Sequence, residues 1–459
     1  MSTEKKAHPS RPRKGVPGEP WGLEFPEGFL WAAGEDAYQH EGGNDHADWY
    51  DWEHSDPRPF SDGSVSGICA DFWNRYESDF TLAERDGHNA HRIGIEWSRV
   101  EPEQGIYDDR AFARYGDMLR SLRDKGFTVF VNLWHFTLPA WAARKGGWLN
   151  DEVFTRWERY VAACTRRFGP YVDYWSTMID AQIYVLRGWF VGDIPPLKND
   201  KEEGIRVFSR ILDAHAAAYR IIKGEPSAWR TGKVAPRVGM IYFFALYQPR
   251  RTFLDRFVCT QLDRFFNRNM PDALMTGRLE IRMAGGPNLR LRRQSWEGTL
   301  DWLGVNYYYR QIVSFSPKTL GLVRMDHGSG PVKSDMGWEI YPEGLYTLCA
   351  ELSTRYPGLP LMITESGMAD AEDSRRPRMI VDHAAQVHRL ISDGYPVLGF
   401  TYWSLTDNLE WTEGFGPKFG LYRVDRETME RFETRSARLF RFMATRNRTP
   451  TLAEFESLG

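Results

Sequence analysis

The chain has 459 residues, of which 42% are apolar and 26% charged, as in an ordinary globular protein. Its formal net charge of −3 gives no reason to expect nucleic acid or an anionic membrane as the partner. No stretch approaches the roughly 20 apolar residues of a membrane-spanning helix. We therefore expect a small-molecule partner, and the sequence leaves open whether the protein is a homo-oligomer.

Residues 1–20 are rich in Lys, Arg, Pro and Gly and contain no apolar segment like that of a secretory signal. This composition predicts a disordered N-terminal tail followed by one domain over residues 21–459. The cysteines are widely spaced and form no CxxC pair, which favours reduced thiols in a cytoplasmic protein. They are Cys69, Cys164, Cys259 and Cys349.

From residue 21 onward, short apolar runs that are rich in β-branched and aromatic residues alternate with helical stretches. One such stretch, residues 108–126, carries apolar residues at helical spacing. Eight βα units in one chain predict an α/β fold, a single-domain (β/α)8 TIM barrel. The strand candidates are residues 29–34, 90–97, 128–136, 174–180, 237–247, 300–308, 359–367 and 397–405.

Polar and aromatic side chains gather where these runs end. The C-terminal ends of the strands form the face of a TIM barrel that carries the active site. Because a strand that turns polar at a buried end is otherwise a poor structural choice, the pattern predicts a site there. These residues are Glu96, Trp97, His135, Asp180, Asn306, Tyr308, Glu365 and Trp403.

Two of the strand ends carry candidate catalytic carboxylates, Asp180 and Glu365. Retaining glycoside hydrolysis uses two carboxyl groups about 5–5.5 Å apart across the sugar. One carboxylate attacks the anomeric carbon, and the other protonates the leaving oxygen and later activates water. A pair of strand-end acids is weak evidence alone, because structural ion pairs are common there.

The residues around these acids resemble glycoside hydrolase family 1, the β-glucosidase and β-galactosidase family, and within it the archaeal β-glycosidases. The resemblance runs from about residue 25 to about residue 447 and depends on several motifs in the same order. They are residues 25–31 (FPEGFLW), 38–42 (YQHEG), 92–99 (RIGIEWSR), 134–139 (WHFTLP), 304–308 (GVNYY), 363–367 (ITESG), 403–411 (WSLTDNLEW) and 419–420 (FG).

The resemblance implies that Glu365 is the nucleophile, with Arg92 and Tyr308 beside it to hold the carboxylate ionised. Asn306 would support them. It further implies a hydrolase of carbohydrate metabolism that needs no cofactor and no metal. The implied substrate-binding residues are Gln39, His135 and Glu410 for the sugar hydroxyls, Trp403 and Trp411 for the stacking floor and a further donor, and Phe419.

The strand-four motif departs from the family pattern, which reads Asn-Glu-Pro where this chain has Ile179, Asp180 and Ala181. Aspartate pulls the carboxyl back by roughly 1 Å, an error that can cost about 100-fold in rate. Ile179 removes a polar partner of the sugar 2-hydroxyl. We therefore expect a specialised substrate: a 2-deoxy or 2-substituted sugar, or a bulky natural-product glycoside.

A second departure places Glu35 and Asp36 where the family has small neutral residues. Either acid could replace the lost glutamate, or could form an ion pair with Arg92, and His40 could carry a proton. Three hypotheses follow: a retaining β-glycosidase or transglycosidase with Asp180 as an atypical acid/base, a biosynthetic enzyme that acts on a glycosylated or polyol-like metabolite, and a catalytically impaired sugar-binding protein.

Overall fold

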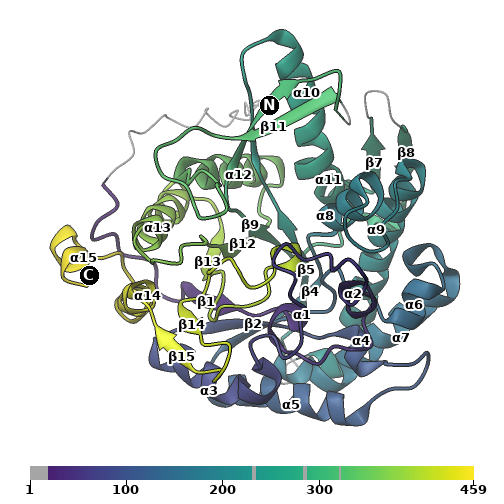
Figure 1. Cartoon of the computed structure of the whole chain (residues 1–459), viewed down its shortest axis with the longest axis horizontal. Coiled ribbons are helices and arrows are strands. Elements are labelled where there is room, and N and C mark those ends of the chain that lie inside the picture. Colours follow the sequence, from purple (N-terminus) through teal and green to yellow (C-terminus); the bar gives the residue numbers. More distant parts are fainter. Residues whose placement is uncertain (1–18, 230–233, 283–286, 320–321, 459) are drawn as a thin grey trace, which may run out of the picture.

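The computed structural model describes residues 19–229, 234–282, 287–319 and 322–458, so residues 1–18 of the expected N-terminal tail lie outside it. Eight parallel strands close into a barrel with the wall order β1-β13-β12-β9-β5-β4-β3-β2 (Figure 1). Each of the eight predicted runs contains one wall strand, which confirms the TIM barrel. These strands are β1 (Leu30–Gly34), β2 (Ala90–Gly94), β3 (Thr128–Asn132), β4 (Tyr174–Ile179), β5 (Arg237–Phe243), β9 (Trp302–Asn306), β12 (Leu361–Ser366) and β13 (Val397–Tyr402).

The run at residues 237–247 is the one that divides. The wall strand β5 ends at Phe243, and the chain then leaves the barrel for a small three-stranded sheet of β6, β10 and β11. Between β5 and β6, the Asn267 amide donates a hydrogen bond of 2.8 Å to the Ala245 carbonyl and so holds the backbone where it leaves the barrel. The strands outside the barrel are β6 (Leu246–Pro249), β7 (Arg278–Ile281), β8 (Leu289–Arg292), β10 (Arg310–Phe315), β11 (Val323–His327), β14 (Tyr422–Val424) and β15 (Arg431–Glu433).

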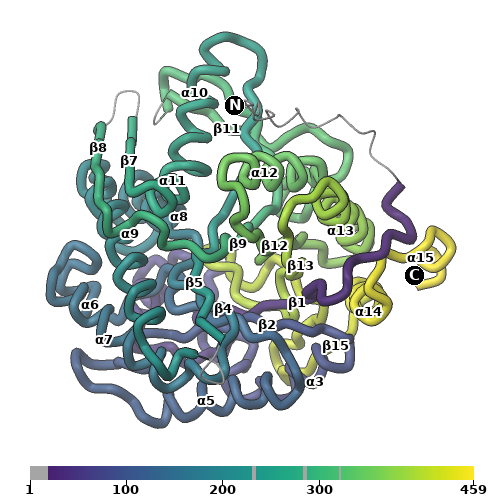
Figure 2. Tube along the Cα trace, turned by 180° about the vertical axis from the view of Figure 1, so that it is seen from behind, coloured from purple at the N-terminus to yellow at the C-terminus, as the bar shows by residue number. Residues whose placement is uncertain are grey.

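Long helices surround the wall and are seen from both sides in Figures 1 and 2. The stretch predicted at residues 108–126 is α5, which begins after Asp108 because that side chain accepts hydrogen bonds from Arg110 and Ala111 N–H groups. No helix within the described ranges is both long and apolar enough to cross a membrane. The outer helices are α3 (Phe72–Arg85), α5 (Asp109–Asp124), α7 (Asp151–Phe168), α9 (Lys201–Gly224), α10 (Phe253–Asp263), α11 (Asn269–Thr276), α12 (Pro342–Arg355), α13 (Arg376–Ser392), α14 (Arg435–Arg446) and α15 (Leu452–Ser457).

Short helices follow several strand ends and shape the C-terminal face of the barrel. They are α1 (Ala37–His40), α2 (Asp48–Glu53), α4 (Trp97–Val100), α6 (Ala140–Arg144) and α8 (Ala181–Val185). Three of them, α1, α4 and α8, begin within three residues of the end of β1, β2 and β4.

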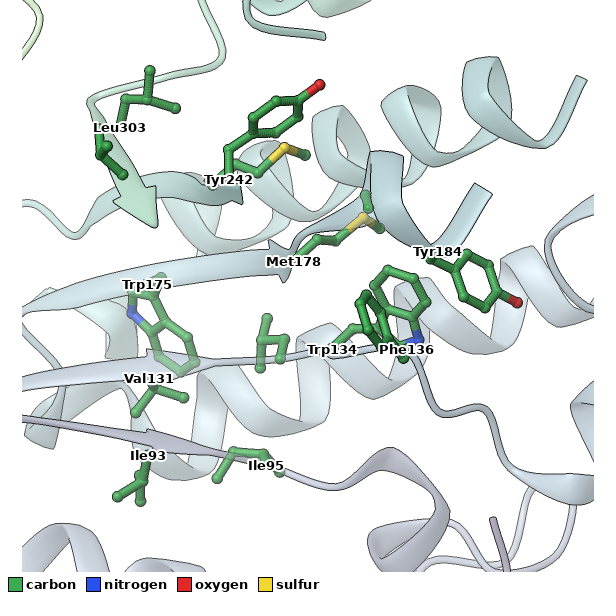
Figure 3. Packing of buried hydrophobic residues seen from close by; sticks show 14 of the residues in the cluster. Ile93, Ile95, Val131, Trp134, Phe136, Trp175, Met178, Tyr184, Tyr242 and Leu303 are labelled. Carbon is green, nitrogen blue, oxygen red and sulfur yellow. The ribbon is translucent and has the colours of Figure 1, made fainter. Parts of the chain in front are cut away.

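The strands bury side chains on both faces, as parallel strands do. Trp175 and Met178 of β4 belong to the large apolar layer between strands and helices (Figure 3). Ile179 instead belongs to the barrel interior, where it packs in one buried cluster with Phe130 and Trp302. The interior is therefore a packed core directly below the site, and Ile179 is part of that core.

The four cysteines lie on separate parts of the helical shell and are all unpaired and buried. Burial raises the pKa of each thiol. Cys69 precedes α3, while Cys164, Cys259 and Cys349 lie in α7, α10 and α12.

Candidate active site

Glu365 projects from β12 at a point where the strand register is irregular. The pairing of β12 with β9 shifts between Ile363 and Glu365, so that Glu365 faces Asn306 of β9. The pairing of β4 with β5 shifts in the same way between Ser176 and Ile179, just before Asp180. Such bulges re-aim side chains and are typical of strands that carry active sites.

Arg92 and Tyr308 both contact the Glu365 carboxylate. Arg92 Nη2 lies 2.7 Å from Oε1, and the Tyr308 hydroxyl donates to Oε2 at 2.7 Å. Burial raises the pKa of Glu365, and the positive charge of Arg92 opposes that rise. The two partners thus favour the ionised form that a nucleophile requires.

Asp180 follows β4 and begins α8 with a left-handed backbone, φ 51°. The amide nitrogen of Asn306 donates to both of its carboxyl oxygens, at 3.2 and 3.3 Å. Thr364 donates to the other end of that amide at 2.8 Å. Burial, together with the charge of Glu365, raises the pKa of Asp180 well above its ordinary value, which favours a protonated carboxyl group.

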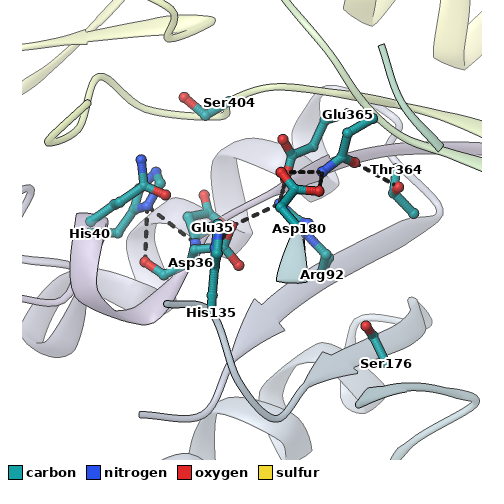
Figure 4. A network of polar contacts seen from close by, with 12 residues as sticks. Glu35, Asp36, His40, Arg92, His135, Ser176, Asp180, Thr364, Glu365 and Ser404 are labelled. Atoms are coloured by element: carbon teal, nitrogen blue, oxygen red, sulfur yellow. Dashed lines mark hydrogen bonds and ion pairs between the residues drawn. The ribbon is translucent and has the colours of Figure 1, made fainter. Parts of the chain in front are cut away.

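Asp36 forms an ion pair with Arg92 at 3.2 Å. The same oxygen, Oδ2, lies 3.0 Å from His135 Nδ1 (Figure 4). Burial alone would raise the pKa of Asp36, but Arg92 and His135 outweigh it and lower the pKa to about 2. Of the two roles that the sequence leaves open for Asp36, the contacts are those of the ion pair.

Glu35, the second acid of this segment, contacts His91 instead. The His91 ring packs edge-on against Phe80 and Phe127 in the layer between strands and helices. This contact directs Glu35 away from Glu365. His40 is also fixed, because its Nδ1 lies 3.1 Å from the Asp36 carbonyl, and burial lowers its pKa to about 4. His40 is therefore uncharged at neutral pH.

The residues expected to bind the sugar surround the two carboxyl groups. Gln39 donates to the Leu409 carbonyl at 2.9 Å. Burial and the nearby Glu365 raise the pKa of Glu410 to about 8. Three aromatic residues complete this group. The Trp403 ring lies 5.4 Å from the guanidinium carbon of Arg92, and Phe419 shares a buried cluster with Trp403 and Tyr308. The ring centroid of Trp411 lies 4.8 Å from that of His135.

One aromatic residue near the site was missed by the sequence analysis. Trp338 lies 5.7 Å from Tyr308 and 4.9 Å from Tyr309, measured between ring centroids. It also lines a cavity of about 570 Å³ with Asp62 and Glu413. Trp338 stands in a loop between β11 and α12, outside every predicted strand, so no strand pattern could have identified it.

The chain is similar to known proteins over nearly its whole length. Residues 22–449 match the family model described as "Glycosyl hydrolase family 1". The chain belongs to glycosyl hydrolase family 1. As a member of family 1 with this barrel, it is an O-glycosidase of the β-glucosidase and β-galactosidase type, as its sequence predicts.

Its family 1 relatives include archaeal proteins, which confirms the expected resemblance. A β-galactosidase of Pyrococcus woesei is 31% identical, with 95% of this chain and 99% of the relative covered. β-Glucosidase A of Thermotoga maritima is 28% identical over 89% of this chain and 94% of the relative. The solved structure of a β-glycosidase from Pyrococcus horikoshii superposes with a TM-score of 0.85 at 32% identity, covering 95% and 97% of the two chains.

Proposed function

We propose that the protein is a retaining β-glycosidase in which Glu365 is the nucleophile and Asp180 the acid/base. The observation that supports this most strongly is the contrast between the two carboxyl groups. Glu365 is paired with the cation Arg92, whereas Asp180 accepts hydrogen bonds from the neutral Asn306 amide. Two acids whose surroundings separate their protonation states are suited to complementary roles.

The contacts support a two-step reaction. Glu365 attacks the anomeric carbon while Asp180 transfers its proton to the leaving oxygen. Loss of the leaving group leaves a glycosyl ester on Glu365 and an ionised Asp180. Asp180 then takes a proton from water, or from another acceptor hydroxyl, as that oxygen attacks the ester. Throughout the cycle, Arg92 and Tyr308 stabilise the Glu365 carboxylate whenever it is free.

The named relatives act on β-galactosides and β-glucosides, so we extend a β-linked hexose glycoside to this chain. Gln39, His135 and Glu410 would bind its hydroxyls, and Trp403, Trp411 and Phe419 would pack against the ring. Because Ile179 belongs to the apolar barrel interior, it offers no partner to a 2-hydroxyl. A specialised substrate, altered at C2 or in its aglycone, fits this change. We place the enzyme in the cytoplasm, on the basis of its four unpaired thiols.

A covalent trap tests the proposal. Activated 2-deoxy-2-fluoro glucosides and galactosides should increase the intact mass of the protein by one glycosyl group that maps to Glu365. The trap requires a nucleophile and a glycone pocket but little help from an acid. Glu365→Gln should show no mass gain, while Glu101→Gln, a buried glutamate that contacts Trp97 and Gly105, should label normally. No labelling with either sugar would favour the biosynthetic or sugar-binding hypothesis.

A further inference from the structure

Asp36 presents an unused hydrogen-bond acceptor at the site. It is 1% exposed, and its Oδ2 already contacts both Arg92 and His135. Its other oxygen, Oδ1, is buried and has no hydrogen-bond partner among the residues that the structure describes. An ionised carboxylate oxygen without a donor is costly when buried, so this atom favours a ligand that brings a donor.

Other oxygens of the pocket lack partners as well, and the Arg92 nitrogens Nε and Nη1, which have no partner among the described residues, belong to the guanidinium that already pairs with Asp36 and Glu365. Within the described part of the chain, Gln39 Oε1 and Glu410 Oε2 are likewise buried without a partner. His135 Nδ1 faces the ionised Asp36 at 3.0 Å and therefore carries a hydrogen. Where an amide donor would be expected, the chain has the hydrocarbon side chain of Ile179.

The charges point in the same direction. Four carboxyl groups, those of Asp36, Asp180, Glu365 and Glu410, influence one another in the site, and Arg92 is the guanidinium that contacts two of them. Asp36 and Glu365, the two that contact Arg92, share this single guanidinium, so their two negative charges exceed its one positive charge. A ligand that carries a positive charge would balance this excess, whereas a neutral hydroxyl would not.

We propose that the glycone pocket selects a sugar with a protonated amino group at C2, and that Asp36 is the residue that determines this specificity. An ammonium group has three donors and no acceptor, which complements the unpartnered oxygens. C2 is the position indicated because Asp36 and Glu365 contact the same nitrogen, Nη2 of Arg92. Asp36 thus lies next to the nucleophile, and C2 is the ring carbon next to the carbon under attack. The inference depends on the proposed glycosidase function and specifies its substrate class.

Binding of non-hydrolysable ligands tests this inference without requiring turnover. We would measure, by calorimetry at pH 6, the dissociation constants of phenyl 1-thio-β-glucoside and of its 2-amino-2-deoxy and 2-acetamido-2-deoxy analogues. At this pH an ordinary α-amine, with a pKa of about 7.7–8.0, is protonated. The amine should bind at least about tenfold more tightly than the hydroxyl parent, since a charge-assisted hydrogen bond contributes that much. The neutral acetamide should gain nothing.

Asp36→Asn keeps the shape of the side chain and removes its charge. In this variant the ratio between the hydroxyl and amine constants should fall to about one. Asp79→Asn is the matched control, because Asp79 is a buried aspartate paired with Arg431. It should keep the wild-type ratio even if the protein becomes less stable.

Equal binding of the amine and the hydroxyl parent by the wild-type protein would overturn the inference, whether or not Asp36→Asn folds. An unchanged ratio in Asp36→Asn would also overturn it. The covalent trap on the same preparation separates the two proposals. Labelling of Glu365 without a preference for the amine would support the glycosidase function and contradict the amino-sugar specificity. A preference for the amine without labelling would support the specificity of the pocket and contradict the role of Glu365 as nucleophile.

Discussion

Residues 179 and 180 set the reach and the surroundings of the proposed acid. Asp180 is short, and its left-handed backbone is one that aspartate adopts more readily than most residues. Ile179 belongs to the packed interior beneath it. The local sequence therefore places a protonated carboxyl group above an apolar cluster, where the Asn306 amide donates a hydrogen bond to it.

Restoring the family residues with Ile179→Asn and Asp180→Glu should increase kcat/KM for an aryl β-glucoside by about 10- to 100-fold, because the carboxyl regains roughly 1 Å of reach. The new amide enters an apolar cluster, so the variant should also lose about 1–3 kcal/mol of stability. Steady-state kinetics and thermal melts would check both effects. Ile179→Asn alone is the control, and no gain in the double variant would count against an impaired acid.

Asp180→Asn should make the protein more stable at neutral pH while it removes the acid. The folded-state pKa of Asp180 lies well above its unfolded value. Above about pH 4 the unfolded chain therefore releases a proton that the folded chain retains. The Asp180 carboxyl group thus lowers the free energy of unfolding of the wild-type protein as the pH rises. The stabilisation should be a few degrees in Tm at pH 7 and should vanish near pH 3.

The activity of Asp180→Asn would complete that test. Hydrolysis of glucosides with poor leaving groups should fall by about 100-fold or more, and activated aryl glucosides should be affected much less. A Tm difference that is the same at pH 3 and pH 7 would show that Asp180 ionises in the folded protein as it does in the unfolded one.

A hydrogen bond between side chains of β9 and β12 determines which end of the Asn306 amide contacts Asp180. The Thr364 hydroxyl donates to the Asn306 oxygen, which turns the Asn306 nitrogen toward Asp180. The strands themselves were predictable from the sequence, because each is an apolar run and most of these runs end in polar or aromatic residues. The bulges before Asp180 and Glu365 were not, because a register shift depends on the partner strand.

Thr364→Val should lower kcat/KM about tenfold, because the Asn306 amide is then free to turn its oxygen toward Asp180. KM should change little. Thr177→Val on β4 is a matched control: it also removes a buried hydroxyl, but one that contacts His215 Nδ1 at 2.7 Å. Equal kinetic losses in the two variants would assign the effect to general destabilisation of the barrel.

Over the whole molecule, the sequence sufficed for the number of wall strands and for the order in which they close. It did not suffice for the exit at Ala245, because β5 and β6 form one continuous apolar run. Nor did it decide between the possible partners of Glu35 and Asp36. These adjacent acids turn to different faces, one to His91 and one to Arg92, and that choice depends on residues some 56 positions away in the chain.

The two ends of the domain are joined below the barrel. Asn447, after α14, accepts from the Trp31 indole at 3.0 Å and donates to the Phe25 carbonyl at 2.8 Å. Asn447→Ala should lower Tm by about 2–4 °C, since it leaves buried groups unpaired. kcat/KM at 25 °C should stay unchanged. A parallel fall in activity would mean that the N-terminal strand and the site are coupled.

The distribution of the thiols has a practical consequence. The four thiols lie near or in four different helices of the outer layer, and all of them are buried in the folded protein. They are Cys69, Cys164, Cys259 and Cys349. A thiol reagent therefore meets each sulfur only when its own sector opens. The order in which a thiol reagent modifies the four cysteines should therefore report the order in which the surrounding helices unfold.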